Sequence, residues 1–402
     1  MLKPRARRLS LDGAFFSASA SLVLVFVVAG APIPMMGRFE AAGLSTADFA
    51  FASCFYFVAA AAGLLVLGRL SGFLGRRPVA VLALVVAALG CLALIDVRAG
   101  WQLMVGRGLH GLACGIAPGA LGAFVVDAAG ARRWQPALIT SSAPMMGLPI
   151  GAVAAGLALG PAGLDLAVVL LVLCAAAGLC AGLLWWSPET VERRRGARAS
   201  MRPRLGFGRS ALRSTLASAA IFAASWPLGG FYQAFGSVFA ADVLSITSVT
   251  VASLVFACIF VLNPVGGLLA SRTPALPGVR WGMTVYAISL GGVHLALRAG
   301  EVVWFVCGCL VTGLVQGIAA TSAMRLLLPQ LGPAERSGAL ALVYLTGYSS
   351  VAVAGLGAGL SASVADLPAI ALIYGVIGLL FAVLAIVLPV DPHITRSQHG
   401  HE

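Results

Sequence analysis

Residues 166–186 of this sequence read LAVVLLVLCAAAGLCAGLLWW, a stretch without a single charged side chain. A helix needs about 20 apolar residues to cross the roughly 30 Å hydrocarbon layer of a bilayer. Lipid offers the backbone no hydrogen-bond partner, so a crossing segment has to bond its own N–H and C=O groups. The stretch therefore predicts a membrane-spanning α-helix.

The composition of the whole chain has the same character. Of its 402 residues, 60% are hydrophobic and only 10% are charged, whereas soluble domains carry roughly 25% charged residues. So few charges cannot cover a soluble fold, and so much apolar surface excludes a disordered chain. We therefore expect an all-α polytopic membrane protein.

Eleven further stretches resemble the first, which makes twelve expected spans. They are Ala14–Met36, Ala47–Leu67, Pro78–Ile95, Trp101–Val126, Pro136–Leu159, Leu166–Trp186, Ser214–Phe235, Val249–Leu269, Trp281–Leu297, Val302–Leu328, Ala339–Leu360 and Ile370–Leu388. The first could instead be a cleaved signal peptide, since Ala29-Gly30-Ala31 resembles a cleavage site. Its apolar run is long for that role, and we expect a retained span.

The basic residues lie almost entirely on one side of these spans. Of the 26 Lys and Arg residues, only Arg38, Arg98 and Arg298 fall in the opposite loops, and only Arg107 falls well inside a span, since Arg325 lies at the basic-side end of its span. Basic residues gather in cytoplasmic loops, so both termini are expected in the cytoplasm. The protein itself is expected in a bacterial inner membrane. Basic patches between apolar blocks also argue against a nucleic-acid partner, despite the net charge of +12.

A long basic segment divides the chain near its middle. The expected organisation is a tail (1–13), a first six-helix bundle (14–186), a linker (187–213), a second bundle (214–388) and a tail (389–402). One shift in register aligns Gly111 with Gly313, Leu112 with Leu314, Gly115 with Gly317, Gly130 with Gly332, Ala137 with Ala339 and Leu138 with Leu340. Chance similarity between glycine-rich helices is the alternative, but agreement across two spans and their loop favours an internal repeat.

The motifs of this sequence are those of a known family. The loop after the second span, GRLSGFLGRR (68–77), matches the signature G-x-L-a-D-R-x-G-R-R at Gly68, Leu70, Gly75, Arg76 and Arg77, with Gly72 at the position of the acid. A weaker copy follows the eighth span at 267–272, where Ser271 holds that position. The fourth span has Arg107, Gly111, Gly115, Pro118 and Asp127, and the sixth ends in Ser187-Pro188-Glu189-Thr190. The chain thus resembles the major facilitator superfamily.

This resemblance implies two pseudo-symmetric six-helix bundles that rock about one central cavity. Gly147, Pro149 and Gly151 resemble the glycine-proline motif of the family's drug/proton antiporters, with the proline displaced by one place. The mid-depth candidates for the cavity are aromatic, amide, basic and Met side chains, which suit a partly apolar substrate. They are Tyr56, Arg107, His110, Met145, Met146, Trp226, Tyr232, Gln233, Asn263, Gln316, Tyr344 and Tyr348. For each taken alone, helix packing is the alternative.

Arg107 and Asp48 are the candidates for proton coupling. A charge inside a span is costly unless it faces water or a partner, so Arg107 is expected to be functional; snorkelling to the interface is the alternative. Ala14–Met36 contains no acid, which leaves Asp48, although Asp48 also suits a helix cap. His110, three residues after Arg107, is a candidate proton relay, and polar packing is its alternative.

The resemblance also implies a cytoplasmic charge cluster that acts as a conformational latch. Its expected members are Gly68, Gly75, Arg76, Arg77, Asp127 and Glu189, with Arg272, Glu335 and Arg336 as second-half equivalents. Such a cluster stabilises one rocked state over the other. The loss of the acid at Gly72 is expected to loosen it.

The expected function is secondary active transport of small molecules by alternating access, as a proton-coupled exporter of amphipathic compounds. The alternatives are a facilitator or importer of a small metabolite, and a non-transporting membrane sensor or scaffold. We expect no enzyme, because no metal-site, nucleophile or P-loop pattern occurs, and no metal or cofactor other than a coupling proton. All eight cysteines lie in apolar blocks, so no disulfide framework is expected. The expected partners are the bilayer and a small-molecule substrate, and the expected oligomeric state is a monomer.

Overall fold

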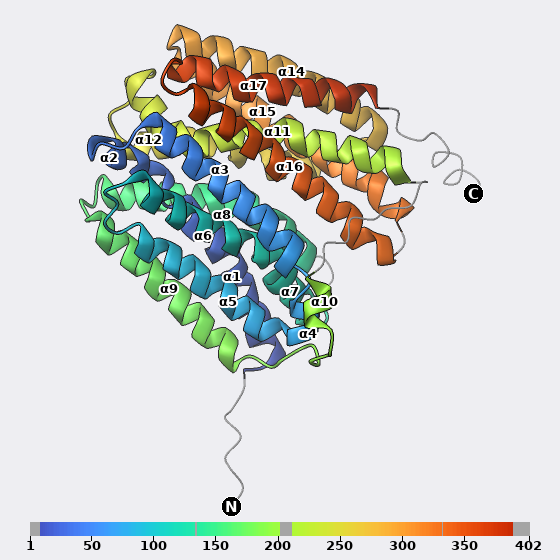
Figure 1. The fold of residues 1–402 in the computed structure, drawn as a ribbon. Helices are drawn as coiled ribbons and strands as arrows, with labels where there is room; N and C mark the ends of the chain where they lie inside the picture. Colours follow the sequence, from blue (N-terminus) through green and yellow to red (C-terminus); the bar gives the residue numbers. More distant parts are fainter. Residues whose placement is uncertain (1–8, 133–134, 202–210, 332, 389–402) are drawn as a thin grey trace, which may run out of the picture. The chain divides into compact units, whose positions relative to one another are not determined.

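The computed structural model describes residues 9–132, 135–201, 211–331 and 333–388, and these residues form helices and turns without a strand (Figure 1). The α-helices are α1 (Leu11–Gly30), α2 (Met36–Ala41), α3 (Thr46–Ala62), α4 (Ser71–Leu74), α5 (Arg76–Ala93), α6 (Gly100–Ala117), α7 (Ala123–Asp127), α8 (Gln135–Leu159), α9 (Leu166–Trp186), α10 (Ala197–Ser200), α11 (Leu212–Asp242), α12 (Val249–Val261), α13 (Asn263–Ala270), α14 (Ala275–Ala299), α15 (Val302–Leu327), α16 (Pro333–Ser361) and α17 (Leu367–Val387). The expectation of an all-α fold is confirmed.

Ten helical segments of the described chain are long and apolar enough to cross a membrane. They coincide with ten of the twelve expected spans. The other two expected spans, Ser214–Phe235 and Trp281–Leu297, lie in α11 and α14. These helices are 31 and 25 residues long, but neither is among the ten segments. The total of twelve therefore stays a prediction.

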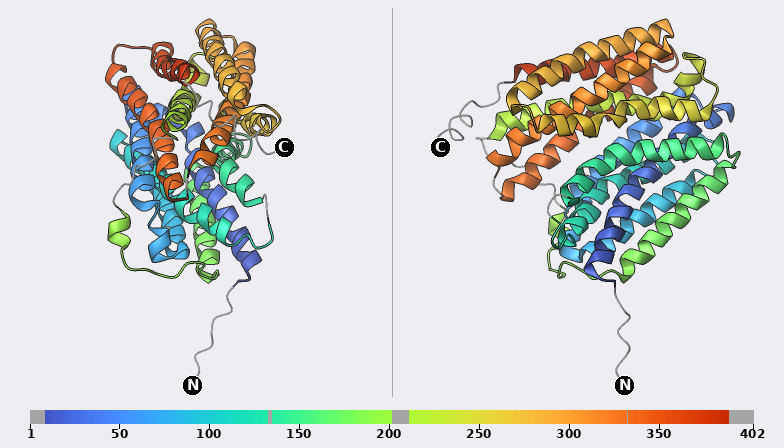
Figure 2. Two further views of the ribbon diagram at one scale, coloured as in Figure 1. Left: turned by 90° about the vertical axis from the view of Figure 1, so that its right-hand side faces the viewer. Right: turned by 180° about the vertical axis from the view of Figure 1, so that it is seen from behind.

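The helices group into two units. The first unit comprises Met1–Pro203, Tyr232–Ala257 and Ala358–Ser363, and the second comprises Arg204–Phe231, Cys258–Gly357 and Val364–Glu402. Within the first unit α3 packs along α6, α1 along α8, and α5 against both α6 and α9. Figure 2 shows the helices from two further sides. Within the second unit α15 packs against α13 and α14, and α14 also packs against α17.

In the first unit, glycines bring α6 against α3. A Cβ atom on Gly111 would lie 2.0 Å from the carbonyl oxygen of Tyr56, and one on Gly115 would lie 2.2 Å from that of Ala60. No side chain fits at such distances, so the two backbones touch. Both contact positions advance by one turn in the same direction, which shows that α3 and α6 run parallel. Small residues are the usual means of close helix approach in membrane proteins.

The second unit repeats this contact. A Cβ atom on Gly313 of α15 would lie 2.1 Å from the carbonyl oxygen of Ile259, and one on Gly317 would lie 2.1 Å from that of Asn263. Two glycines aligned by the register shift in the sequence thus serve the same purpose in each unit. They bring a long helix against the carbonyl groups of its neighbour.

Candidate functional site

Arg107 is buried in the middle of the first unit. Its side chain extends from α6 and is only 1% exposed. The Nη1 atom donates a hydrogen bond to the carbonyl oxygen of Ala29 on α1 at 2.7 Å, and the guanidinium carbon lies 4.7 Å from the ring centroid of Tyr56 on α3. The Nη2 atom is buried and has no hydrogen-bond partner among the described residues. Arginine stays protonated in proteins, so a full charge sits here with one donor group unused.

Ser53 lies at the same level as Arg107 and was not among the expected site residues. The contact between Gly111 and Tyr56 fixes the register of the two parallel helices. One turn earlier on each helix come Arg107 and Ser53. The Ser53 hydroxyl is buried and, like the Nη2 atom of Arg107, has no partner in the described part of the chain. A lone serine in an apolar helix carries no signal in the sequence, so only the packing register identifies it.

His110 is equally buried but contacts a different helix. A Cβ atom on Gly90 of α5 would lie 2.4 Å from its ring, and its Nε2 atom lies 3.7 Å from the sulfur of Cys91. The His110 ring therefore faces α5, whereas Arg107 three residues earlier on the same helix faces α1 and α3. The Nδ1 atom of His110 is buried and has no hydrogen-bond partner among the described residues, and a role of His110 in proton relay stays a prediction.

Asp48 forms the capping arrangement that the sequence left open as its alternative. Its Oδ2 atom accepts hydrogen bonds from the backbone N–H of Ser45 at 2.8 Å and from the Ser45 hydroxyl at 2.7 Å. The Asp48 N–H in turn donates to the Ser45 oxygen, which completes a capping box at the start of α3. A role of Asp48 in proton coupling stays a prediction.

Three expected substrate residues form an aromatic cluster in the second unit. The ring centroid of Trp226 on α11 lies 4.8 Å from that of Tyr348 and 5.9 Å from that of Tyr344, both on α16. Phe222, which was not expected, lies 5.6 Å from Trp226 and 5.4 Å from Tyr344. We call these four residues the aromatic cluster. It offers a broad apolar surface with tyrosine hydroxyl and indole N–H groups.

The remaining substrate candidates lie at other positions. Tyr232 and Gln233 are buried on α11, Gln316 is buried on α15, and Asn263 is half-buried at the start of α13. On α8, Met145 is half-buried and Met146 is exposed. The structure thus brings together two groups of the expected residues, Arg107 with Tyr56 and Trp226 with two tyrosines.

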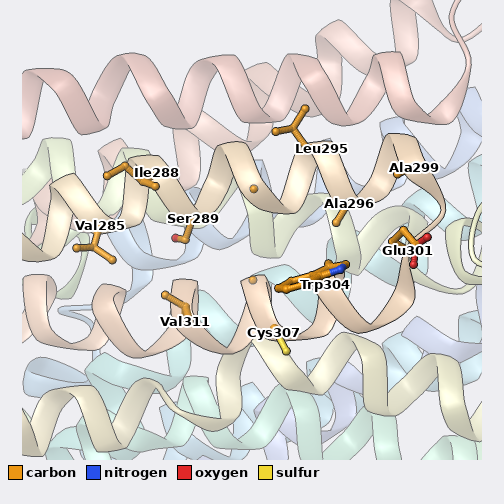
Figure 3. Close-up of a pocket in the computed structure, with 12 residues that line it drawn as sticks. Val285, Ile288, Ser289, Leu295, Ala296, Ala299, Glu301, Trp304, Cys307 and Val311 are labelled. Atoms are coloured by element: carbon orange, nitrogen blue, oxygen red, sulfur yellow. The ribbon is translucent and has the colours of Figure 1, made fainter.

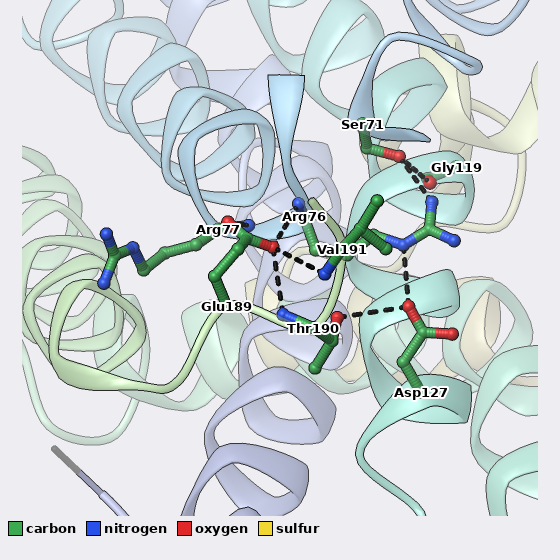
Figure 4. Close-up of polar contacts among 8 residues, drawn as sticks. All are labelled: Ser71, Arg76, Arg77, Gly119, Asp127, Glu189, Thr190 and Val191. Carbon is green, nitrogen blue, oxygen red and sulfur yellow. Dashed lines mark hydrogen bonds and ion pairs between the residues drawn. The ribbon is translucent and has the colours of Figure 1, made fainter. Parts of the chain in front are cut away.

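A polar network joins three segments of the first unit, and Glu189 is at its centre (Figure 4). Its carboxylate accepts hydrogen bonds from the backbone N–H of Arg76 at 2.7 Å and of Arg77 at 3.2 Å, at the start of α5. A carboxylate is favourable at a helix N-terminus because the first N–H groups are otherwise unpaired. Gly75 has a φ of 103°, and a Cβ atom there would lie 2.5 Å from the Glu189 carboxylate. Only glycine satisfies both constraints.

The side chain of Arg76 extends the network to the end of α7. Its Nε atom donates to Asp127 at 2.8 Å and its Nη1 atom donates to the Ser71 hydroxyl at 2.9 Å. Ser71 donates to the carbonyl oxygen of Gly119 at 2.6 Å, and the Thr190 hydroxyl donates to Asp127 at 3.1 Å. Ser71 and Thr190 were not expected members, because a hydroxyl in a loop has many possible partners.

Two further expected members of the network lie beside it. Arg77 donates to the carbonyl oxygens of Trp185 at 3.0 Å and Ser187 at 3.3 Å, and its guanidinium lies over the Trp185 ring. Gly68 is in close contact as well, because a Cβ atom on Gly119 would lie 2.0 Å from its carbonyl oxygen. The network therefore consists of the loop, the end of α7 and the segment after α9.

The second-half equivalents differ from the expectation. Arg272 is exposed, and it is Arg325 on α15 that donates to the carbonyl oxygens of Ala270 and Thr273 at the end of α13. The side chains of Glu335 and Arg336 lie outside the described residues.

The comparison with known proteins agrees with this fold and these motifs. The model of the Major Facilitator Superfamily matches residues 14–327. The chain belongs to this superfamily. As a superfamily member with ten long apolar helices in its described part, the protein is an integral membrane transporter. No curated protein matches the chain.

Two solved transporter structures share the fold. The D-xylose-proton symporter has a TM-score of 0.73 at 16% identity, over 95% of this chain and 99% of that one. A mutant of the nucleoside transporter NupG has a TM-score of 0.67 at 13% identity, over 93% of this chain and 99% of that one. At these identities the likeness shows the fold alone.

An open groove of about 590 Å³ lies between α14 and α15 of this superfamily member (Figure 3). Ile288, Leu295 and Trp304 line it and are each about 70% exposed. Exposed apolar side chains on a membrane-spanning protein face lipid. None of the expected substrate residues lines this groove, so it is separate from both residue groups described above.

Proposed function

We propose that this protein is a secondary active transporter that exports amphipathic compounds in exchange for protons by alternating access. Arg107 is the observation that carries the proposal. A charged side chain within a span costs several kcal/mol unless it is compensated, and here the compensation is one carbonyl group and one aromatic ring. A residue kept at that cost is expected to act on a substrate or a proton.

The aromatic cluster supports a partly apolar substrate. Trp226, Tyr344 and Tyr348 combine ring surface with polar groups, which suits the apolar body of an amphipathic compound. The resemblance of Gly147, Pro149 and Gly151 to the glycine-proline motif of the family's antiporters supports export. A Cβ atom on Gly151 of α8 would lie 2.0 Å from the carbonyl oxygen of Val27 on α1, so this motif serves as a close helix contact here.

A facilitator that moves its substrate without a proton is the second candidate. The observation in its favour is that α1 has no acid beyond Asp12 in its first turn, while Asp48 is engaged in a helix cap. The distribution of arginines supports the further proposal that both termini lie in the cytoplasm of a bacterial cell, with the protein in its inner membrane. We also propose a monomer with no cofactor. Lipid and a small-molecule substrate are its proposed partners, and nucleic acid is not.

The cytoplasmic network is proposed to act as a latch. Arg76 joins Asp127 to the loop, and Glu189 joins the segment after α9 to the start of α5. A break in either contact would change the relative stability of the two rocked states.

Proteoliposomes test the proposal. Radiolabelled amphipathic compounds are offered to sealed vesicles of determined protein orientation, with and without a pH gradient. Accumulation driven by the gradient supports the proton-coupled exporter, whereas equilibration that ignores the gradient supports the facilitator. Binding without movement across the vesicle would support a sensor or scaffold and would contradict both.

A further inference from the structure

The charge of Arg107 has no counter-ion among the described residues. The described residues form three ion pairs, and none of them includes Arg107. Its contacts are a carbonyl oxygen and an aromatic ring, which carry partial charges only. An uncompensated buried cation is costly, and the cost falls when an anion with good hydrogen-bond geometry is supplied.

The helices around Arg107 cannot supply that anion. Across α1, α3 and α6 the only carboxylates are Asp12 and Asp48. Asp12 is in the first turn of α1 and pairs with Arg132 at 2.8 Å. Asp48 accepts hydrogen bonds from Ser45 in the capping box. Both acids are therefore engaged elsewhere.

Two unused donors lie at the same level of these helices. The Nη2 atom of Arg107 and the hydroxyl of Ser53 are both buried, and neither has a partner among the described residues. Their residues are 1% and 3% exposed. A carboxylate accepts hydrogen bonds readily from a guanidinium and a hydroxyl, and charge-assisted hydrogen bonds are stronger than neutral ones. Buried polar groups left unpaired at this cost point to a ligand that pairs them.

We propose that Arg107 and Ser53 form an anion subsite and that the substrate is a small organic monoanion bound through its carboxylate. One guanidinium matches one negative charge, so a monoanion leaves the subsite neutral. This inference rests on the proposed function, because alternating access has to expose the buried subsite to the substrate. It names the substrate class that the proposed transporter moves.

Matched pairs of ligands test the subsite in the wild-type protein. Benzoate and phenylacetate are titrated against benzamide and phenylacetamide, with the purified full chain in lipid nanodiscs and calorimetry as the readout. Each amide has nearly the shape of its acid but no charge. We expect the amides to bind at least about tenfold more weakly, as the loss of a charge-assisted hydrogen bond implies. Equal affinity within a pair would overturn the proposal.

Variants assign the effect to the two residues. Arg107→Gln is expected to lower the affinity for benzoate to that for benzamide, and Arg107→Lys to restore part of the difference. Ser53→Ala is expected to weaken benzoate several-fold and to leave benzamide unchanged. Arg298→Gln removes the same charge from an exposed position at the end of α14 and should change nothing. An equal loss in the Arg298 variant would contradict the assignment, because it would indicate a general charge effect.

Two further measurements separate this inference from the proposed function. Competition by chloride as strong as that by phenylacetate would overturn the organic substrate and leave a site for inorganic anions. Proteoliposomes that transport neutral or cationic compounds but no carboxylate would overturn the anion subsite and leave the transporter intact. Carboxylates that bind at Arg107 but never cross the vesicle would leave the subsite and overturn the transporter.

Discussion

The contact of α3 with α6 and the contact of α12 and α13 with α15 use the same backbone arrangement. Gly111 and Gly313 each place a helix against a carbonyl oxygen of its neighbour. One turn before these glycines the two copies differ, because α6 carries Arg107 and α15 carries Cys309, which is fully buried. The close helix contact therefore requires no charge. Since the scaffold is complete without it, Arg107 is explained by function better than by packing.

Alanine at either glycine tests whether the two contacts are equivalent. Gly111→Ala and Gly313→Ala each put a Cβ atom about 2 Å from a backbone oxygen, which a side-chain rotation cannot relieve. We expect each to cost about 3 kcal/mol of stability, the upper end for overpacking. Thermal unfolding in detergent measures it. Gly108→Ala and Gly291→Ala are the controls, since nothing lies within 4 Å of a Cβ atom at those positions. A large loss in only one of the two copies would show that the contacts are not equivalent.

Exchange of the differing residue tests whether Arg107 has a functional role. Arg107→Cys makes the first copy like the second, and we expect it to lower the rate of transport by about 10- to 100-fold, as loss of one charge-assisted contact implies. Its thermal stability should stay equal or rise, because an unpaired buried charge is removed. Cys309→Ala should leave the transport rate within about twofold. Normal transport by the Arg107 variant with reduced stability would assign this residue to packing.

The residues involved in these contacts differ in how well the sequence reveals them. Gly111 and Gly313 could be aligned in advance, because helix periodicity and one register shift are local properties. Arg76, Asp127 and Glu189 could be grouped through a family signature, although their sequence positions are far apart. Ser53 could not be identified, since its level relative to Arg107 depends on the register of α3 against α6.

The polar contacts near the ends of the spans show the same limit. Arg272 and Arg325 are both arginines near the ends of expected spans, and only the side-chain geometry shows that Arg325 caps α13. Asp48 satisfied the sequence pattern for a coupling acid and for a cap, and the hydrogen bonds to Ser45 show the cap. Partner choice by long or polar side chains is a tertiary property, so a single sequence leaves it open.

Gly75 and Gly72 lie in the same loop of the first unit but differ in the space available for a Cβ atom. Gly75→Ala places a Cβ atom 2.5 Å from the Glu189 carboxylate at a φ of 103°. We expect a cost of about 2 kcal/mol, from the left-handed backbone and the displaced carboxylate together. Gly72→Ala has open space and lies within α4, so it should be neutral or slightly stabilising. Thermal unfolding separates the two, and equal effects would mean that Glu189 does not hold the start of α5.

Asp127→Asn has the smallest expected effect on stability and tests the latch in the first unit. The pair with Arg76 is partly solvent-exposed, with side chains 29% and 19% exposed, and an asparagine oxygen still accepts from Arg76 and Thr190. The cost should therefore be about 1 kcal/mol or less.

Asp127→Asn should also shift the population away from the outward-open state, because it weakens a contact that joins the loop to α7. Faster alkylation of a cysteine introduced by Ser218→Cys, which replaces a buried residue near the start of α11, reports that shift. Asp96→Asn removes an exposed pair with Arg98 and serves as the control. Alkylation rates that match between the two variants would show that the Arg76–Asp127 pair stabilises the loop without biasing the conformation.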